Sequence, residues 1–261
     1  MMKTYPSNLS KRQRHMIVPL LPKRGNASRQ KWKWKVILNA LCYVLRTGCQ
    51  WRELPDSFPP WQTIYAYHRR FCKHGVWEKL NTVLRIRLRL RSQRNASPSA
   101  VIFDTQSVKA LCGGEERGFD GYKRVNGRKR FLLVDTLGLL LSVQVVPANT
   151  AETAAAMRGL ETLGETYAGV NLAWADQGFT GAPFRTWLKD TLGWDLELTS
   201  GISKPGKPDF EVAPRRWVVE RTIAWLCRHR RLLCDFERLV QVGIGWVYAA
   251  MTLLMVRRLA Q

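Results

Sequence analysis

A change of hydrophobic periodicity near residue 100 limits most strongly how this chain can fold. Before that point the apolar residues recur at helical spacing, and helices are expected over 32–45, 61–74 and 77–91. After it, short apolar runs alternate with helical patterns. We therefore expect a helical N-terminal domain over 1–92, a linker over 93–99, and an α/β domain over 100–261.

The second domain is expected to hold five strands, over 100–104, 130–135, 139–146, 172–175 and 194–198. Asn149 and Glu152 have the spacing of a capping box, which predicts a helix start at that point. Pro183 can open a second helix, and a third is expected over 215–229. This order predicts a mixed five-stranded sheet flanked by helices.

The segment from Leu239 to Val256 is almost wholly apolar and is long enough to approach a membrane span. Gln241, Gly243 and Gly245 interrupt it, and the chain before it has the composition of a soluble basic protein. We therefore expect a buried C-terminal helix rather than a transmembrane anchor.

The charge is strongly positive and unevenly distributed. The chain carries 42 Lys and Arg against 20 Asp and Glu, a net charge of +22, and residues 1–100 contribute +18 of it. Nucleic acid is the usual partner of such an excess, because basic side chains displace the counterions on phosphates. A basic membrane-surface protein is the weaker alternative. The asymmetry suggests that the N-terminal part binds and the C-terminal part does chemistry.

The six cysteines include no CxxC pair, so a structural zinc site is not expected. His68, Cys72 and His74 lie close in sequence, but no fourth ligand is evident, and core and surface positions are the simpler interpretation. The cysteine use and the lack of a signal-peptide pattern favour a reducing cytoplasm.

Three acids occupy positions at which an acid is unusual. Asp104 follows the apolar run 101–103, Asp176 follows the run 172–175, and Glu220 lies on an expected helix between apolar residues. If the first and fourth strands are neighbours, Asp104 and Asp176 can lie side by side at strand ends. Carboxylates that close repel one another unless a cation such as Mg²⁺ binds them, and two such ions can clamp the oxygens of a phosphoryl transfer. Helix caps or surface acids remain the alternative from spacing alone.

Several long motifs in the chain resemble the bacterial DDE transposases of the insertion-sequence-five type, within the IS4/IS5-like superfamily. The resemblance covers nearly the whole chain, through "LRTGCQWRELPDSFPPWQTIYAYHRRF" (45–71), "GVWEKL" (75–80), "DTQSVK" (104–109), "GFDGYKRVNGRKRFLLVDTLGLLLSV" (118–143), "ADQGFTG" (175–181), "PRRWVVERTIAWL" (214–226) and "RHRRL" (228–232). These motifs are long, ordered and jointly specific.

The resemblance implies a ribonuclease-H-like fold with Asp104, Asp176 and Glu220 as a metal-binding catalytic triad. It also implies Arg216 as an arginine near the active site. The implied cofactor is Mg²⁺, with Mn²⁺ as a substitute and two ions per site, Asp104 bridging both. The implied partner is double-stranded DNA, as terminal inverted repeats and as target, bound by a homodimer or larger synaptic complex. The implied location is the bacterial cytoplasm, on the nucleoid through DNA, with no membrane partner.

The chain departs from the family pattern at four positions. Phe131 stands where a His is usual, and Phe179 where a Tyr is usual. Ala213 stands in place of a Tyr, and Cys227 in place of a basic residue, with Arg228 beside it. The acidic triad is complete, so these departures put secondary contacts in doubt rather than the activity.

Basic residues in both domains are candidates for DNA contact, because phosphate is the polyanion they would meet. Four arginines at alternate positions in 85–91, with no acid among them, favour phosphate contact over a merely solvated face. The candidates are Lys31, Lys33, Lys35, Arg69, Arg70, Arg85, Arg87, Arg89, Lys109, Lys123, Arg124, Arg128, Lys129, Arg130 and Arg216.

Two other functions are compatible with these features. A ribonuclease-H-like nuclease or junction resolvase would cut DNA without joining it. A regulator derived from a transposase would bind DNA without cutting, although the intact triad argues against this function.

Overall fold

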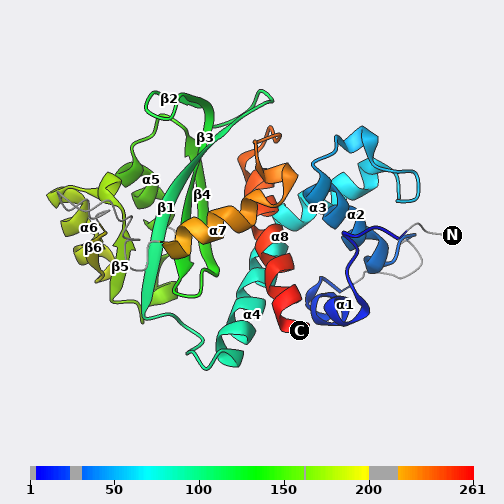
Figure 1. The fold of residues 1–261 in the computed structure, drawn as a ribbon, viewed down its shortest axis with the longest axis horizontal. Helices are drawn as coiled ribbons and strands as arrows, with labels where there is room; N and C mark the ends of the chain where they lie inside the picture. The colour runs from blue at the N-terminus through cyan, green and yellow to red at the C-terminus, as the bar shows by residue number, and fades with distance from the viewer. Residues whose placement is uncertain (1–3, 24–30, 162, 200–216) are drawn as a thin grey trace, which may run out of the picture. The chain divides into compact units, whose positions relative to one another are not determined.

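The computed structural model of the chain describes residues 4–23, 31–161, 163–199 and 217–261 (Figure 1). The chain forms two compact units. The first unit comprises residues 1–88, 111–115 and 226–261, and the second comprises 89–110 and 116–225. The C-terminal residues thus belong with the N-terminal helices, whereas the predicted domains follow chain order. The functional division at residues 92 and 100 stays a prediction.

The first unit is helical, as the periodicity before residue 100 predicts. Its elements are α1 (Lys11–Ile17), η1 (Val18–Leu20), α2 (Trp34–Thr47), η3 (Trp51–Glu53), α3 (Trp61–Lys73), most of α4 (Val76–Arg91), η6 (Arg230–Leu232) and α8 (Val240–Leu259). The three expected helices are confirmed to within two residues at each end. Gly48 ends α2 at a φ of +69°, a backbone conformation that glycine adopts without steric cost. The alternating arginines before residue 92 lie on a helix, not on a strand.

The centre of the first unit is the apolar helix α8. Trp246 is 1% exposed and stacks on the His68 ring at 3.8 Å between centroids, and Trp51 packs against both rings, 5.9 Å from Trp246 and 6.4 Å from His68. A Cβ on Gly245 would lie 2.3 Å from the Cys72 sulfur, so only glycine permits this approach of α8 to α3. By length and composition α8 could cross a membrane, but 72% of its apolar window is buried inside the structure. The expected buried C-terminal helix is therefore what the structure contains.

His68 belongs to this core. Its Nδ1 accepts a hydrogen bond from the Trp77 indole at 3.2 Å, and its Nε2 lies 3.4 Å from the Val242 carbonyl oxygen. One nitrogen accepts and the other donates, which is the pattern of a neutral imidazole. Burial accordingly lowers the pKa of His68 from 6.5 to about 3. His68 and Cys72 are buried and His74 is exposed, so the core-and-surface interpretation of these residues is confirmed.

The second unit is built on a mixed sheet. Its strands are β1 (Ala100–Lys109), β2 (Gly118–Asp120), β3 (Val125–Asp135), β4 (Leu140–Pro147), β5 (Leu172–Ala175) and β6 (Asp195–Leu198). β1 lies between β3 and β5, with β4 beyond β3 and β6 beyond β5. β1 is antiparallel to β3 and parallel to β5. The expected ribonuclease-H-like sheet of five strands is confirmed, and the three-residue strand β2 on β3 is an addition that the sequence did not predict.

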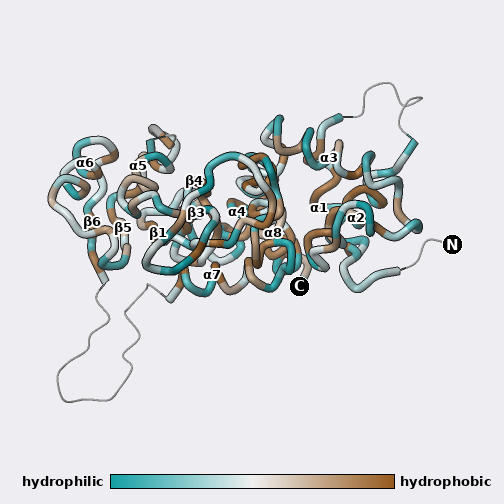
Figure 2. Tube along the Cα trace, turned by 90° about the horizontal axis from the view of Figure 1, so that it is seen from above, coloured by the Kyte–Doolittle hydropathy of each residue, from teal (hydrophilic) through white to brown (hydrophobic). Residues whose placement is uncertain are grey.

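Helices cover both faces of this sheet. α5 (Glu152–Glu161) and α6 (Ala182–Leu192) lie on one face and α7 (Trp217–Cys227) on the other (Figure 2). The face under α5 and α6 carries the aromatic core of the unit, in which Phe103 contacts Phe131, Phe179 and Phe184. Two departures from the family pattern, Phe131 and Phe179, are thus fully buried core positions. The 3-10 turns of this unit are η4 (Gly164–Tyr167) and η5 (Gln177–Phe179).

Three expectations need comment. The prediction that Asn149 and Glu152 form a capping box is wrong, because α5 begins at Glu152 itself and not directly after Asn149. The expected helix over 215–229 is described from Trp217 to Cys227, and Arg215 lies outside the described residues. Ala213 also lies outside them.

Candidate active site

Asp104 lies within β1 and Asp176 directly follows β5, at the same offset from the paired residues of these neighbouring parallel strands. The pairing of β1 with β5 matches Ala100 to Leu172 and Ile102 to Trp174, and each acid lies two residues beyond that last pair. The two strands separate after this point, because β5 ends at Ala175 while β1 continues to Lys109 along β3. Asp176 then caps the turn η5, its Oδ1 accepting from the Gly178 N–H at 2.9 Å. The expectation that these two strands are neighbours is confirmed.

Both acids also lie on the same face of the sheet. Side chains alternate along a strand, and Phe103 and Ala175 belong to the core under α5 and α6. Their neighbours Asp104 and Asp176 therefore point to the opposite face, the one that α7 covers (Figure 2). An apolar run followed by an acid thus places two carboxylates on one face of the sheet, where β5 ends and β1 continues.

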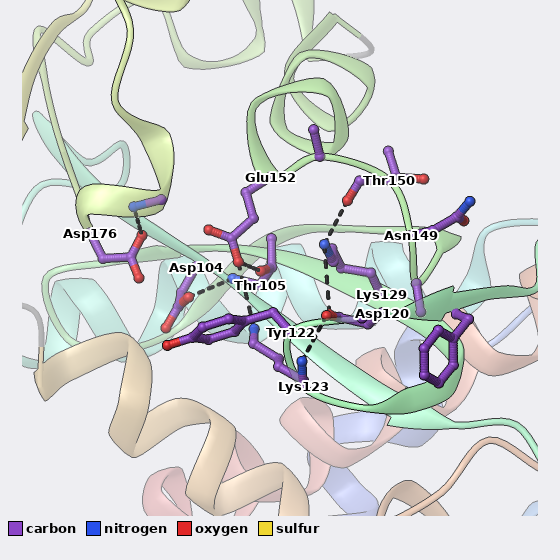
Figure 3. Close-up of a pocket in the computed structure, with 15 residues that line it drawn as sticks. Asp104, Thr105, Asp120, Tyr122, Lys123, Lys129, Asn149, Thr150, Glu152 and Asp176 are labelled. Carbon is purple, nitrogen blue, oxygen red and sulfur yellow. Dashed lines mark hydrogen bonds and ion pairs between the residues drawn. The ribbon is translucent and has the colours of Figure 1, made fainter.

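The two acids line a pocket of about 700 Å³. The pocket also contains two further acids and two lysines, which Figure 3 shows pointing into the same space. Its lining residues are Asp104, Thr105, Phe119, Asp120, Gly121, Tyr122, Lys123, Lys129, Ala148, Asn149, Thr150, Ala151, Glu152, Asp176 and Gly178. The pocket therefore combines hard oxygen donors with cationic groups, the two features that bind metal ions and phosphates.

Asp120 organises one side of the pocket. Its carboxylate accepts from the Ser107 hydroxyl at 2.7 Å and from the Lys123 N–H at 2.9 Å, and it lies 3.9 Å from the Lys129 ammonium. Burial alone would raise the pKa of Asp120, but these hydrogen bonds and the two lysine charges outweigh it and lower the pKa. Lys129 also donates to the Thr150 carbonyl oxygen, so its ammonium is fixed at the pocket wall.

Glu152 is the pocket residue whose role sequence reasoning missed. One of its carboxylate oxygens accepts from the Thr105 hydroxyl at 2.8 Å and lies 3.6 Å from the Lys123 ammonium. The other carboxylate oxygen of Glu152 lies so close to Gly178 that a Cβ on Gly178 would be only 1.7 Å from this oxygen. Glu152 thus joins β1 to the turn after β5, beside both aspartates. The sequence showed only an acid near a helix start, which an ordinary helix terminus also favours.

Glu220 lies in the first turn of α7, and its side chain is exposed. It is not among the residues that line the pocket. Arg221 and Thr222 beside it anchor the helix, donating to the carbonyl oxygens of Leu137 at 3.2 Å and of Gly138 at 2.8 Å. The structure therefore brings Asp104 and Asp176 together and places Glu220 on the helix that covers their face, outside the pocket lining.

The donor chemistry of the pocket fits a hard divalent cation, since its acids offer carboxylate oxygens and no thiolate or imidazole lines it. Across the described residues, however, no three His, Cys, Asp or Glu side chains stand close enough to hold a metal ion as they are placed. A site made of Asp104 and Asp176 therefore requires a further ligand to approach, or water to complete the coordination.

The candidate DNA contacts differ in their burial. Nine have exposed side chains: Lys31, Lys33, Lys35, Arg69, Arg70, Arg87, Lys109, Lys123 and Arg124. Four others are buried in the structure, and their contact with DNA stays a prediction: Arg85, Arg89, Arg128 and Arg130. Lys129 is buried but lines the pocket, and Arg216 lies outside the described residues.

Comparison with known proteins gives a consistent result. Residues 95–255 match the model of the family described as "Transposase DDE domain", and residues 9–81 match the one described as "Putative transposase of IS4/5 family". An uncharacterized 16.2 kDa protein of insertion element IS402 from Burkholderia cepacia is 30% identical over 110 residues, which are 40% of this chain and 74% of that protein. A crystal structure of a pre-cleavage Mos1 transpososome aligns over 92% of this chain and 82% of its own, at 11% identity and a TM-score of 0.23, too low to bear on the fold.

Proposed function

The chain belongs to the transposase DDE-domain family and is an insertion-sequence transposase, and from that premise we propose that Asp104, Asp176 and Glu220 carry its chemistry. The observation that supports this proposal most directly is the shared position of Asp104 and Asp176, each two residues beyond the last paired residues of the adjacent parallel strands β1 and β5. Acids at that place would repel one another unless they bind a cation.

The proposed cofactor is Mg²⁺, with two ions per site and Mn²⁺ as a substitute. When bound, the ions would supply charge neutralisation and a more acidic attacking water. Asp104 and Asp176 would hold them, while Lys123 and Lys129 at the same pocket would orient the phosphate. Water attack breaks a phosphodiester at the transposon end and leaves a 3′-hydroxyl. That hydroxyl then forms a bond to a target phosphorus as the target strand's own 3′-oxygen leaves.

Two glutamates could supply the third carboxylate, and we favour Glu220. It lies on α7, which covers the sheet face toward which both aspartates point (Figure 2). Glu152 reaches the pocket from α5, on the other face, and its Oε1 is engaged by both Thr105 and Lys123. We assign Glu152 the role of holding Lys123 in place.

The proposed partners are the terminal inverted repeats and target DNA, bound within a homodimer or a larger synaptic complex on the nucleoid. The exposed lysines around α2 and the exposed arginines of α3 are the candidate contacts of the first unit, namely Lys31, Lys33, Lys35, Arg69 and Arg70. Counterion release at these contacts would make the binding fall steeply with salt.

The test is a series of single carboxylate-to-amide substitutions, each preserving shape while removing a charge. Asp176→Asn and Glu220→Gln should each reduce Mg²⁺-dependent cleavage of terminal-repeat DNA by orders of magnitude and weaken Mn²⁺ binding measured by calorimetry. Glu152→Gln should reduce cleavage far less and leave Mn²⁺ binding intact. Asp190→Asn, at an exposed acid of α6 outside the pocket, is the matched control and should change neither quantity.

The pattern of results decides between the glutamates. Loss of Mn²⁺ binding in Glu152→Gln with retention in Glu220→Gln would assign the third ligand to Glu152 instead. Near wild-type cleavage by Asp176→Asn would overturn the carboxylate site altogether. A strand-transfer assay on the unmodified protein separates the transposase from a nuclease or resolvase, which would cut and not join.

A further inference from the structure

The helix α7 is joined to the turn between β3 and β4 by two polar contacts. The Arg221 guanidinium donates to the Leu137 carbonyl oxygen at 3.2 Å. The Thr222 hydroxyl lies 2.8 Å from the Gly138 carbonyl oxygen and 3.0 Å from the Val218 carbonyl oxygen of its own helix, so its shorter contact is the one to the turn. Gly138 has a φ of +77°, and a Cβ on it would lie 2.8 Å from the Thr222 hydroxyl oxygen. A side chain at this position would push the helix away, and only glycine permits the contact.

The turn itself is firmly held. The Asp135 carboxylate is buried, and one of its oxygens accepts the N–H groups of Leu137 at 2.9 Å and of Leu139 at 2.8 Å. The Gly138 N–H donates to the Asp135 carbonyl oxygen at 2.9 Å, and Arg89 pairs with the other carboxylate oxygen. Because these bonds fix the backbone whose carbonyl oxygens α7 contacts, the turn is a preorganised anchor for the helix.

The position of α7 depends on such contacts. The helix is 11 residues long, and a helix of that length is marginal by itself in water, so packing decides where it lies. The Arg221 guanidinium also packs against the rings of Trp217 and Trp225, at 4.3 and 4.7 Å from their centroids. Thr222 is fully buried. The contacts of these two residues therefore order the turns of α7 that include Glu220.

Glu220 is the residue whose position these contacts determine most directly. Arg221 follows it in the chain, and Thr222 lies two residues beyond it. With the helix backbone fixed at this point, only the side-chain torsions of Glu220 remain free to bring its carboxylate toward Asp104 and Asp176. A displacement of about 1 Å can lower a rate about 100-fold, so a shift of α7 on the sheet would remove the carboxylate from its place.

We propose that Arg221 and Thr222 are positioning residues of the reaction, which hold Glu220 at the third metal-ligand position by fixing α7 to the β3–β4 turn. The inference rests on the proposed function, because it takes Glu220 as the third carboxylate. In this role both residues act through Glu220 and not on the DNA or the metal themselves. Their loss should lower the rate of the chemical step and the affinity for the cation, and leave the affinity for DNA unchanged.

The experiment compares two variants of Thr222 in the full chain. Thr222→Val removes the hydroxyl and keeps the shape, whereas Thr222→Ser keeps the hydroxyl. Thr222→Val should slow Mg²⁺-dependent cleavage of terminal-repeat DNA about tenfold or more and weaken Mn²⁺ binding in calorimetry, while the DNA concentration at half-saturation changes by less than about twofold. Thr222→Ser should retain most of the rate. Thr47→Val is the matched control, because it removes a hydroxyl that likewise donates to a carbonyl oxygen, in α2, and it should change none of these quantities.

A double-mutant cycle shows whether the effect passes through Glu220. Arg221→Met, which can pack against the two tryptophans but cannot donate, should behave as Thr222→Val does. In the Glu220→Gln background neither substitution should weaken Mn²⁺ binding further, because the carboxylate that they position is already gone. Additive losses would overturn the proposal, since they would show that the contacts only stabilise the fold. So would a cleavage rate of Thr222→Val equal to or above that of the unmodified chain.

Thermal melts of each variant keep a loss of fold from imitating a loss of position, with cleavage measured well below the lowest melting temperature. If Thr222→Val melts below the assay temperature, Arg221→Met, at a partly exposed position, decides the same question.

These outcomes stay distinct from failure of the proposed function. If Glu220→Gln cuts DNA and binds Mn²⁺ as the unmodified chain does, the assignment of the third ligand fails, and the positioning role fails with it. If Glu220→Gln is inactive while Thr222→Val and Arg221→Met are fully active, only the positioning role fails.

Discussion

The arginines of α4 have different structural roles that depend on the helix face on which each one lies. Arg85 and Arg89 are four residues apart and buried, whereas Arg87 and Arg91 are exposed. Residues four apart share a helix face, so the alternation in sequence becomes two separate faces in the structure. Arg89 forms a buried ion pair with Asp135, whose other oxygen accepts the N–H groups of the turn between β3 and β4.

Removal of Arg89 should therefore destabilise the protein rather than simply weaken DNA binding. Arg89→Met leaves the Asp135 carboxylate buried without its cation, which costs about 3–5 kcal/mol. Urea unfolding measures the loss. Arg87→Met on the exposed face of the same helix should stay within about 0.5 kcal/mol. Adding Asp135→Asn to Arg89→Met should recover part of the loss, and equal stability of Arg89→Met and the unmodified chain would contradict the structural role.

At this scale the sequence predicted some site residues and missed others for a physical reason. Asp104 and Asp176 could be found because an acid directly after an apolar run is a local pattern, although β1 continues beyond Asp104 to Lys109. Glu152 and Tyr122 could not, because their place at the pocket depends on how α5 and the turn after β2 pack onto β1. Arg85 and Arg89 could have been separated from Arg87 and Arg91, since helical periodicity alone distinguishes the two faces.

Among the elements, two buried histidines, His68 of α3 and His229 at the start of η6, make stability depend on pH. Burial lowers the pKa of His68 to about 3, and burial with the nearby Arg257 and Arg46 charges lowers that of His229 to about 4. In the unfolded chain both titrate near 6.5. Between the folded and unfolded pKa values the unfolded state binds more protons than the folded state. The free energy of unfolding therefore has its full value above pH 6.5 and decreases as the pH falls.

The expected slope is about 1.4 kcal/mol per pH unit for each histidine between about pH 6 and 4.5. Urea unfolding at a series of pH values measures it. His68→Gln keeps an acceptor for Trp77 and a donor for Val242. This variant should be less stable than the unmodified chain at pH 7, and its free energy of unfolding should change with pH at roughly half the slope. A profile parallel to that of the unmodified chain would show that His68 does not cause the dependence.

Element boundaries were predictable where one residue type dictates them and not elsewhere. Gly48 ends α2 and Pro183 lies at the start of α6, as their backbone preferences require. The start of α5 was misplaced, because Asn149 suits a capping position in sequence while Glu152 engages Thr105 in the fold. β2 is three residues long and exists only through its pairing with β3, so no periodicity could indicate it.

For the whole molecule, the division into units changes how DNA binding should be tested. The basic residues of 1–88 share their unit with 226–261, and Trp246 of α8 packs against both Trp51 and His68. A fragment of residues 1–92 would therefore carry the candidate DNA contacts but lack the helix on which its apolar side chains pack. Charge alone predicts binding by this fragment, and packing predicts that the fragment does not fold.

We expect the fragment 1–92 alone to unfold without a cooperative transition and to bind a dye specific for exposed apolar surface, because burial against α8 is missing. Co-expression of 1–92 with a second chain of residues 226–261 should restore a cooperative thermal melt and yield a complex that survives purification. Trp246→Ala in the second chain should weaken that complex, because it removes the ring stacked on His68, whereas Leu233→Ala at an exposed position should not. DNA binding by the restored complex should fall steeply between 50 and 200 mM salt, as expected of several phosphate contacts. A cooperative melt of 1–92 by itself would show that the N-terminal helices form a domain without α8.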